Sequence, residues 1–257
     1  MTDWKFFKSN KAVLTVCSVL IIVLFIGVFL ENSALISVSK LAVIPAFVGL
    51  YFIRRSYMPN FFFLILLCLF FAELFNTFSS NHGLLNLSRA FNLTGFVLLL
   101  SILMSKLKSI KFEGVVTVYL LVVFIINGYF VYSLFDSVKG EITNNLDMVY
   151  FLGKGGLSLF LGLISFAVYL SRETTRSIIF LVMTLAFLFS DVLNFICNYY
   201  LYYSGFEFVG GVLKIAALFF LMRYIYTHRS TNVRQKKEQS VLLNRSANSG
   251  EIKMQIN

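Results

Sequence analysis

Long apolar segments dominate this chain. Eight of them follow one another along the sequence, at 12–30, 34–53, 61–78, 90–105, 114–135, 147–170, 177–203 and 209–227. At 1.5 Å per residue, a helix of about 20 residues crosses the roughly 30 Å hydrocarbon core of a bilayer. Only 13% of the 257 residues are charged, about half of the share that is usual in a soluble protein. The pattern therefore predicts an all-α polytopic membrane protein with about eight transmembrane helices.

Basic residues gather in every second connection between these segments. Of the 22 lysines and arginines, 17 lie before the first segment, in the second, fourth and sixth connections, or from Arg223 onward. The odd-numbered connections hold only Arg89 and Lys139. Because lysine and arginine stay on the cytoplasmic side, we predict that both termini are cytoplasmic, at the inner membrane if the chain is bacterial. The first segment is too long for a signal peptide and no A-x-A site follows it, so we expect it to stay as a span.

The basic end of the chain, residues 228–257, lacks interleaved aromatic residues and any nucleic-acid-binding signature. We therefore expect a disordered cytoplasmic tail that contacts lipid, and no nucleic-acid partner. The three cysteines lie inside apolar segments, and no CxxC or Cys/His spacing typical of a metal site occurs. The sequence predicts no metal and no cofactor, and it leaves the oligomeric state open.

An internal repeat relates the two halves of the chain. A shift of 118 residues aligns four polar positions: Tyr51 with Tyr169, Arg54 with Arg172, Glu73 with Asp191, and Asn76 with Asn194. The predicted organisation is a short N-terminus (1–11), two four-helix repeats (12–105 and 114–227), a linker (106–113) and the tail (228–257). Because each repeat has an even number of spans, the two would be parallel and related by an axis along the membrane normal.

Five ionisable residues fall inside the predicted spans: Lys40, Glu73, Lys154, Asp191 and Lys214. Each costs about 2.5–3.5 kcal/mol at a helix centre, so burial without a partner is unfavourable. Counted along the spans, all five fall in one layer in the outer half of the membrane. The layer is either a polar cavity open to the outer leaflet or a set of structural ion pairs.

Two segments resemble the YhhN-like lysoplasmalogenase family. The stretch "LAFLFSDVLNFI" is similar to that family's late FxxSD segment, and "LCLFFAELFNTF" takes the place of its GD segment. The stretch "SKLAVIPAFVGLYFIRR" resembles its lysine-containing second span. The chain departs from the pattern at Glu73, which follows Ala72, and in the fourth span, where Asn92 and Thr94 stand and the family's histidine has no counterpart.

The resemblance implies hydrolysis of the vinyl ether bond of a lysoplasmalogen-like lipid. Cleaving an enol ether needs a protonated acid for the β-carbon and a carboxylate that stabilises the oxocarbenium ion or activates water. We assign these catalytic roles to Asp191 and Glu73. Substrate binding is assigned to three lysines and to the two asparagines one helical turn from the acids: Lys40, Lys154, Lys214, Asn76 and Asn194.

Two other functions use the same charges. One is an ion-coupled transporter in which the intramembrane acids and lysines form a proton relay. The other is a non-catalytic sensor or assembly protein in which the cluster is structural. The even-numbered repeat disfavours an inverted-repeat transporter, and the missing histidine disfavours the hydrolase.

Reporter fusions test the predicted topology. Fusions at Met58 and at the C-terminus should report the cytoplasm, and a fusion at Asn32 should report the opposite side, because the basic residues flank the first two sites. A C-terminal fusion that is active outside the cytoplasm would contradict the orientation.

Overall fold

The computed structural model is all-helical over the residues that it describes, 3–53, 58–79, 82–107, 114–140, 145–172, 174–200 and 202–227. The helices are α1 (Asp3–Phe29), α2 (Ser33–Ile53), α3 (Asn60–Thr77), α4 (His82–Leu107), α5 (Gly114–Val138), α6 (Asn145–Arg172), α7 (Thr175–Tyr199) and a last helix (Ser204–Thr227). Seven are long and apolar enough to cross a bilayer, and α1 adds the apolar run Val13–Phe29. The predicted polytopic all-α fold is confirmed. The predicted tail, 228–257, and most of the linker lie outside the described residues.

Two predicted boundaries were wrong, and both matter for the site. α4 begins at His82 rather than at 90, and the last helix begins at Ser204 rather than at 209. The apolar pattern missed these first turns because they carry polar residues, among them Arg89 and Glu207. Both residues therefore belong to helices, although the sequence placed them in connections.

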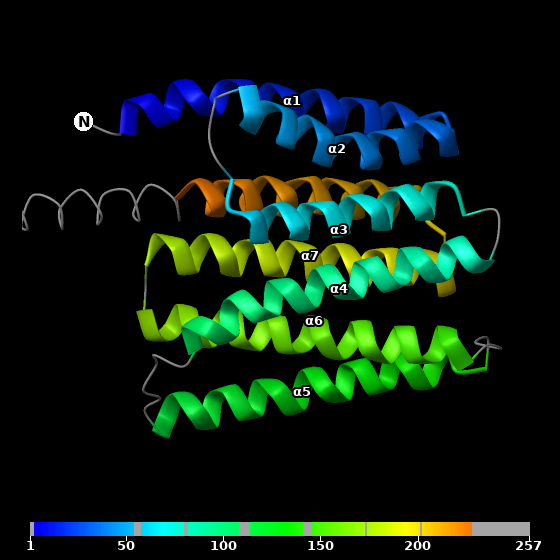
Figure 1. Ribbon diagram of the computed structural model, residues 1–257. Coiled ribbons are helices and arrows are strands. Elements are labelled where there is room, and N and C mark those ends of the chain that lie inside the picture. Colours follow the sequence, from blue (N-terminus) through cyan, green and yellow to red (C-terminus); the bar gives the residue numbers. More distant parts are fainter. Residues whose placement is uncertain are drawn as a thin grey trace, which may run out of the picture.

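The helices run side by side and alternate in direction (Figure 1). Both ends of the helical bundle, the start of α1 and the end of the last helix, consequently lie at the same end of the molecule, on the left of Figure 1. We call the opposite end, where α1 joins α2 and α3 leads to α4, the distal end. The positive-inside pattern predicts that the distal end faces away from the cytoplasm.

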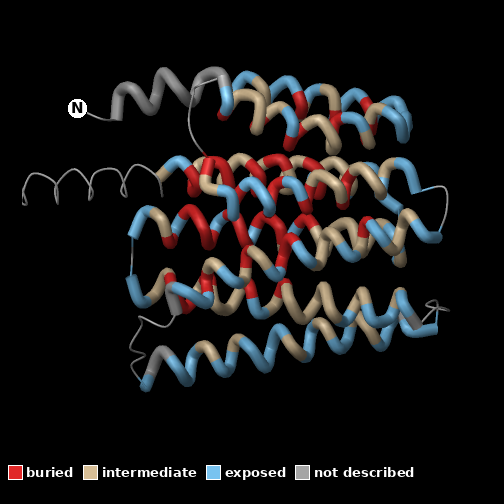
Figure 2. Tube along the Cα trace, viewed as in Figure 1, coloured by how far each residue is buried: buried red, intermediate tan, exposed pale blue. Residues whose placement is uncertain are grey.

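Six helices form the body of the bundle, and α1 and α5 lie at its periphery (Figure 1). α1 packs chiefly on α2, and α5 packs on α6. Between them, α2 packs on α3, α3 on α4, α4 on α6 and α6 on α7. The transmembrane stretch of α5 contains no buried residue, and Figure 2 shows α5 without red along its length. In a bilayer, such an apolar helix faces lipid along most of its surface.

The packing order of the first half recurs in the second. α1 on α2 corresponds to α5 on α6, and α2 on α3 corresponds to α6 on α7. α3 on α4 corresponds to α7 on the last helix, where the Ser190 hydroxyl donates a 2.8 Å hydrogen bond to the Gly210 carbonyl. Because consecutive helices pack together in any up-and-down bundle, the parallel duplication stays a prediction.

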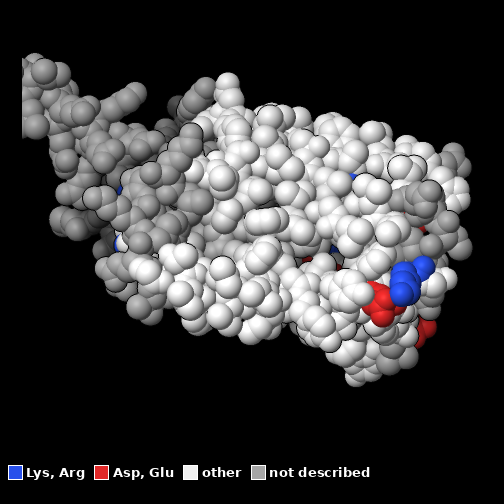
Figure 3. All heavy atoms as spheres, turned by 90° about the horizontal axis from the view of Figure 1, so that it is seen from below, with Lys and Arg blue, Asp and Glu red and all other residues white. Residues whose placement is uncertain are grey.

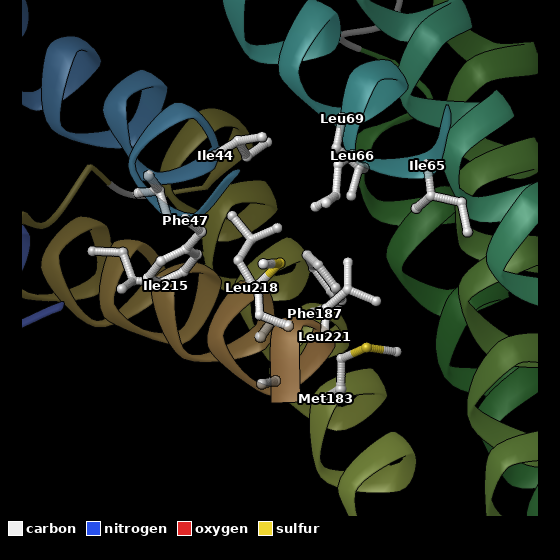
Figure 4. Close-up of a cluster of buried hydrophobic side chains, with 14 of the residues drawn as sticks. Ile44, Phe47, Ile65, Leu66, Leu69, Met183, Phe187, Ile215, Leu218 and Leu221 are labelled. Atoms are coloured by element: carbon white, nitrogen blue, oxygen red, sulfur yellow. The ribbon is translucent and has the colours of Figure 1, made fainter. Parts of the chain in front are cut away.

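The apolar core lies mainly in the half of the bundle opposite the distal end. α2, α3, α7 and the last helix direct leucine, isoleucine, methionine and phenylalanine side chains toward one another there (Figure 4). Ile65, Met183 and Leu221 are fully buried. Buried polar groups in this part of the core include Ser165 and Thr184, whose hydroxyls lie 3.0 Å apart in a hydrogen bond. Burying apolar side chains in contact with one another supplies the van der Waals packing that associates helices in lipid.

Two adjacent glycines of the last helix, Gly210 and Gly211, face the neighbouring helices α7 and α1. A Cβ atom on Gly210 would meet α7 at ordinary distances of 3.5–3.7 Å. A Cβ atom on Gly211 would lie 2.5 Å from Cδ2 of Leu24, a fully buried residue of α1. Small residues of this kind allow close contact between membrane helices. The contact at Gly211 therefore holds α1 against the body of the bundle.

Alanine at these two positions should have opposite effects. Gly211→Ala should lower the free energy of unfolding by about 1–3 kcal/mol, because Leu24 has no space to move into. Gly210→Ala is the matched control and should leave stability unchanged or raised, since alanine favours helix. Thermal unfolding of the purified protein in detergent measures both. Adding Leu24→Val to Gly211→Ala should restore stability, and equal melting temperatures for the two alanine variants would contradict the contact.

Candidate functional site

Glu73 of α3 is the most deeply buried acid of the described chain, with 7% of the residue exposed. Its carboxylate accepts a hydrogen bond from the ammonium group of Lys214 in the last helix, which makes a salt bridge between these helices. The charges of Lys40 and Lys154 also act on this carboxylate. Of the three lysines that the sequence assigned to the site, Lys214 contacts Glu73, whereas Lys40 and Lys154 pair with other acids.

Asp191 of α7 pairs with Lys154 of α6. The Lys154 ammonium donates a 2.8 Å hydrogen bond to Oδ1 of Asp191, and both side chains are about one-fifth exposed. The same ammonium lies 5.7 Å from the ring centre of Phe96 on α4, in a cation–π contact. The positive charge of Lys154 therefore acts on both predicted catalytic acids. It acts on Asp191 by direct contact and on Glu73 from a greater distance.

Lys40 of α2 pairs with an acid that the sequence analysis missed. Its ammonium donates a 3.2 Å hydrogen bond to Oε1 of Glu207 in the last helix. The other oxygen of Glu207 accepts a 2.8 Å hydrogen bond from the hydroxyl of Tyr202, in the connection that precedes this helix. The hydrogen bond to Glu207 is the main reason why the pKa of Tyr202 is raised to about 12. Tyr202 therefore keeps its proton at physiological pH.

A fourth pair joins α4 to α6. The guanidinium group of Arg89 donates a hydrogen bond to Oδ1 of Asp147, and it lies 5.2 Å from the ring centre of Tyr150. Tyr150 also lies beside Lys154, at 5.9 Å from ring centre to ammonium nitrogen. Tyr150 thus connects the Arg89–Asp147 pair to the Lys154–Asp191 pair.

These pairs form one layer, which we call the ion-pair layer. Its members are four basic and four acidic residues, each within ten residues of the distal end of its helix: Lys40, Arg89, Lys154, Lys214, Glu73, Asp147, Asp191 and Glu207. Ten residues span about 15 Å along a helix axis, so the layer occupies the distal half of the bundle. Equal numbers of the two charges make it electrically neutral, and no member lacks an opposite charge.

The ion-pair layer is mostly hidden under apolar side chains. Figure 3 shows one face of the molecule, which is white over most of its described atoms, with red and blue atoms in a recess near the middle. A second charged patch at one end of that face is openly exposed. A charged side chain buried in this way loses most of its hydration. Attraction to the partner charge offsets part of this free-energy cost.

Two of the pairs join corresponding helices of the two halves, although only one residue of each pair corresponds under the internal repeat. The shift of 118 residues places Arg89 over Glu207. Lys40 of the second helix pairs with Glu207 of the eighth, and Asp147 of the sixth pairs with Arg89 of the fourth. Both pairs therefore join the second helix of one half to the fourth helix of the other half. The shift places Lys40 over Ser158 and Phe29 over Asp147, so the correspondence holds for the helices and not for both residues of each pair.

The two predicted asparagines do not behave alike. Asn76 lies exposed near the distal end of α3. Asn194 lies against the last helix, with its Oδ1 3.6 Å from the place of a Cβ on Gly210. Ser190, next to Asp191, uses its hydroxyl for the bond to Gly210. The segment that resembles the family's SD motif thus both packs a helix and supplies an acid.

The overlooked residues had a signal in the sequence. Asp147, Tyr150, Lys154 and Ser158 recur at intervals of three or four residues, which places them on one face of α6. Glu207 precedes Lys214 by seven residues, two helical turns on the same face. The misplaced boundary of the last helix hid this second pattern. It also placed Lys214 too near the distal end, because the helix begins five residues earlier.

The acids and histidines of the described chain do not form a metal site. No three of the histidine, cysteine, aspartate and glutamate residues in the described ranges converge. His82 is exposed at the first position of α4. The chemistry that this arrangement offers is therefore proton transfer and electrostatic stabilisation by paired carboxylates and ammonium groups.

Removing one charge from the Glu73–Lys214 pair should destabilise the fold. Glu73→Gln leaves the Lys214 ammonium without its partner, which should cost about 3–5 kcal/mol. The double variant Glu73→Leu/Lys214→Leu should recover most of this loss, because no buried charge then remains. Unfolding in detergent measures both.

The exposed Asp136–Lys139 pair is the matched control, and Asp136→Asn should leave the unfolding transition unchanged. Wild-type stability in Glu73→Gln would contradict the pairing of Glu73 with Lys214.

No family model, no curated protein and no solved structure matches this chain. The helical architecture and the ion-pair layer therefore carry the functional argument by themselves.

Proposed function

We propose that this chain is an integral membrane hydrolase that cleaves the vinyl ether bond of a lysoplasmalogen-like lipid in the distal half of the bilayer. The observation that carries the proposal is the hydrogen bonding of the Asp191 carboxylate. One of its oxygens holds Lys154, and its other oxygen, Oδ2, is buried and has no hydrogen-bond partner among the described residues. A buried carboxylate oxygen left free in this way can face a cation that forms during a reaction.

The depth of the layer supports a lipid substrate. An acyl-type chain can lie in the bilayer while its head group reaches Lys40, Lys154 or Lys214, about 10–15 Å below the distal ends of their helices. Beyond the layer the core is mostly apolar, and its buried polar side chains include the hydrogen-bonded Ser165 and Thr184. Access from the distal side alone fits an enzyme that draws its substrate from one leaflet.

The neutrality of the layer suggests how a proton reaches the substrate. A lipid phosphate diester brings one negative charge, and Lys214 can bind it by leaving Glu73. A buried carboxylate that has lost its counter-charge takes up a proton, which restores neutrality. Glu73 then donates this proton to the β-carbon of the vinyl ether, and the Asp191 carboxylate stabilises the oxocarbenium ion on the neighbouring carbon.

A non-catalytic scaffold is the second candidate function. The observation that favours it is the complete pairing of the ion-pair layer, in which every charged group already has a partner. Ion pairs between helices can hold a bundle together without any chemistry. A transporter gains less support, because its proton relay would have to cross the apolar part of the core.

Release of fatty aldehyde from a lysoplasmalogen by the purified protein tests the proposal. Wild type should release aldehyde. Asp191→Asn and Glu73→Gln should each lose at least about a hundredfold in rate, the usual contribution of a general acid or base. Each variant is assayed at a temperature at which its unfolding curve shows it folded.

Asp136→Asn, which changes a carboxylate outside the ion-pair layer, is the control and should keep wild-type activity. No aldehyde from folded wild type would leave the scaffold as the better candidate. Full activity in Asp191→Asn would remove Asp191 from the mechanism.

A further inference from the structure

Three buried side-chain oxygens on α4, α6 and α7 have no hydrogen-bond partner within the described part of the chain. They are Oδ1 of Asn92 on α4, Oγ of Ser158 on α6 and Oδ2 of Asp191 on α7. Leaving such groups without partners costs about 1–3 kcal/mol each, so buried polar atoms nearly always bond to protein or to water. Their side chains come from three helices that pack in sequence, α4 on α6 and α6 on α7.

The three oxygens come from helix faces that meet at Lys154. The Lys154 ammonium bonds the other oxygen of Asp191 and touches the ring of Phe96. Ser158 lies one helical turn from Lys154 on α6, and Asn92 lies one turn from Phe96 on α4, so each shares a face with a residue of this contact. The rings of Phe96 and Phe187 meet at 5.8 Å, which brings α4 against α7 one turn below Asp191.

The donors and acceptors of this cluster match a single water molecule. A water molecule has two hydrogens to donate, and the carbonyl oxygen of Asn92 and the free carboxylate oxygen of Asp191 both accept. The hydroxyl of Ser158 can donate to the water oxygen. Buried waters typically make about three such bonds. We infer that Asn92, Ser158 and Asp191 bind one water molecule between α4, α6 and α7.

If the proposed function holds, this water is the nucleophile. After protonation of the β-carbon, the water oxygen bonds to the oxocarbenium carbon, one O–H bond breaks, and Oδ2 of Asp191 takes that proton. The product is a hemiacetal. As the hemiacetal collapses, its hydroxyl proton returns to Glu73, the C–O bond to glycerol breaks, and the glycerol oxygen takes the proton from Asp191. The balance is one vinyl ether and one water in, one aldehyde and one alcohol out.

Asn92 and Ser158 are then positioning residues, which act through the water and do not touch the reacting carbon. Their loss should change which nucleophile captures the cation. Wild type in aqueous methanol should give aldehyde, since the bound water occupies the place of attack. Asn92→Ala and Ser158→Ala should raise the fraction of methyl acetal by about tenfold, roughly the factor for one hydrogen bond.

Gly156→Ala is the matched control on α6, because a Cβ there would meet nothing within 4 Å. Its product ratio should equal that of wild type. Either alanine variant suffices if the other fails to fold. Equal acetal fractions in wild type and in a folded Asn92→Ala or Ser158→Ala variant would overturn the positioning role.

An experimental structure that shows ordered water tests the site without any activity. Density within hydrogen-bonding distance of Asn92 Oδ1, Ser158 Oγ and Asp191 Oδ2 is the expected result. Direct bonds from these three oxygens to protein groups, with no water among them, would overturn the inference. Water at this place in a protein that releases no aldehyde would confirm the site and reject the hydrolase.

Discussion

The cost of placing charge in an apolar environment governs the distal half of this protein. Eight ionised side chains lie within a bundle whose surface and core are otherwise apolar, and an unpaired charge there would destabilise it. Pairing across helices removes most of that cost, and it fixes which helices can be neighbours. The Glu73–Lys214 and Lys40–Glu207 pairs join α3 and α2 to the last helix, and Lys154–Asp191 joins α6 to α7.

The neutrality of the ion-pair layer limits how an anionic ligand can bind to it. Because no described lysine in it is surplus to the acids, an anion can bind only if a carboxylate gives up its partner. That carboxylate must then find a cation or a proton. Anion binding of this kind changes the protonation of one particular carboxylate. A cluster of unpaired lysines would bind the same anion without any change of protonation. Asp191 is poised differently, since one oxygen keeps Lys154 while the other stays available.

The apolar core fills the half of the bundle opposite the ion-pair layer. Residues such as Ile65, Met183 and Leu221 fill the bundle on the side opposite the distal end, and a close contact at Gly211 holds α1 against the last helix. The peripheral α5 belongs neither to the ion-pair layer nor to the apolar core. It is apolar and largely exposed, and it packs on α6. Rigid packing below a polar layer is the arrangement that keeps paired charges in register.

The sequence by itself determined the all-α membrane fold, the number of helices and the layer that contains Glu73, Asp191 and three lysines. Apolar length and the high cost of buried charge are local properties, so residue order alone reveals them. Only the tertiary structure decided the partners. Polar first turns hid the beginnings of α4 and the last helix, and with them Arg89 and Glu207. Which ammonium meets which carboxylate depends on helix neighbours. These are contacts between residues 37 to 167 positions apart, which no sequence spacing encodes.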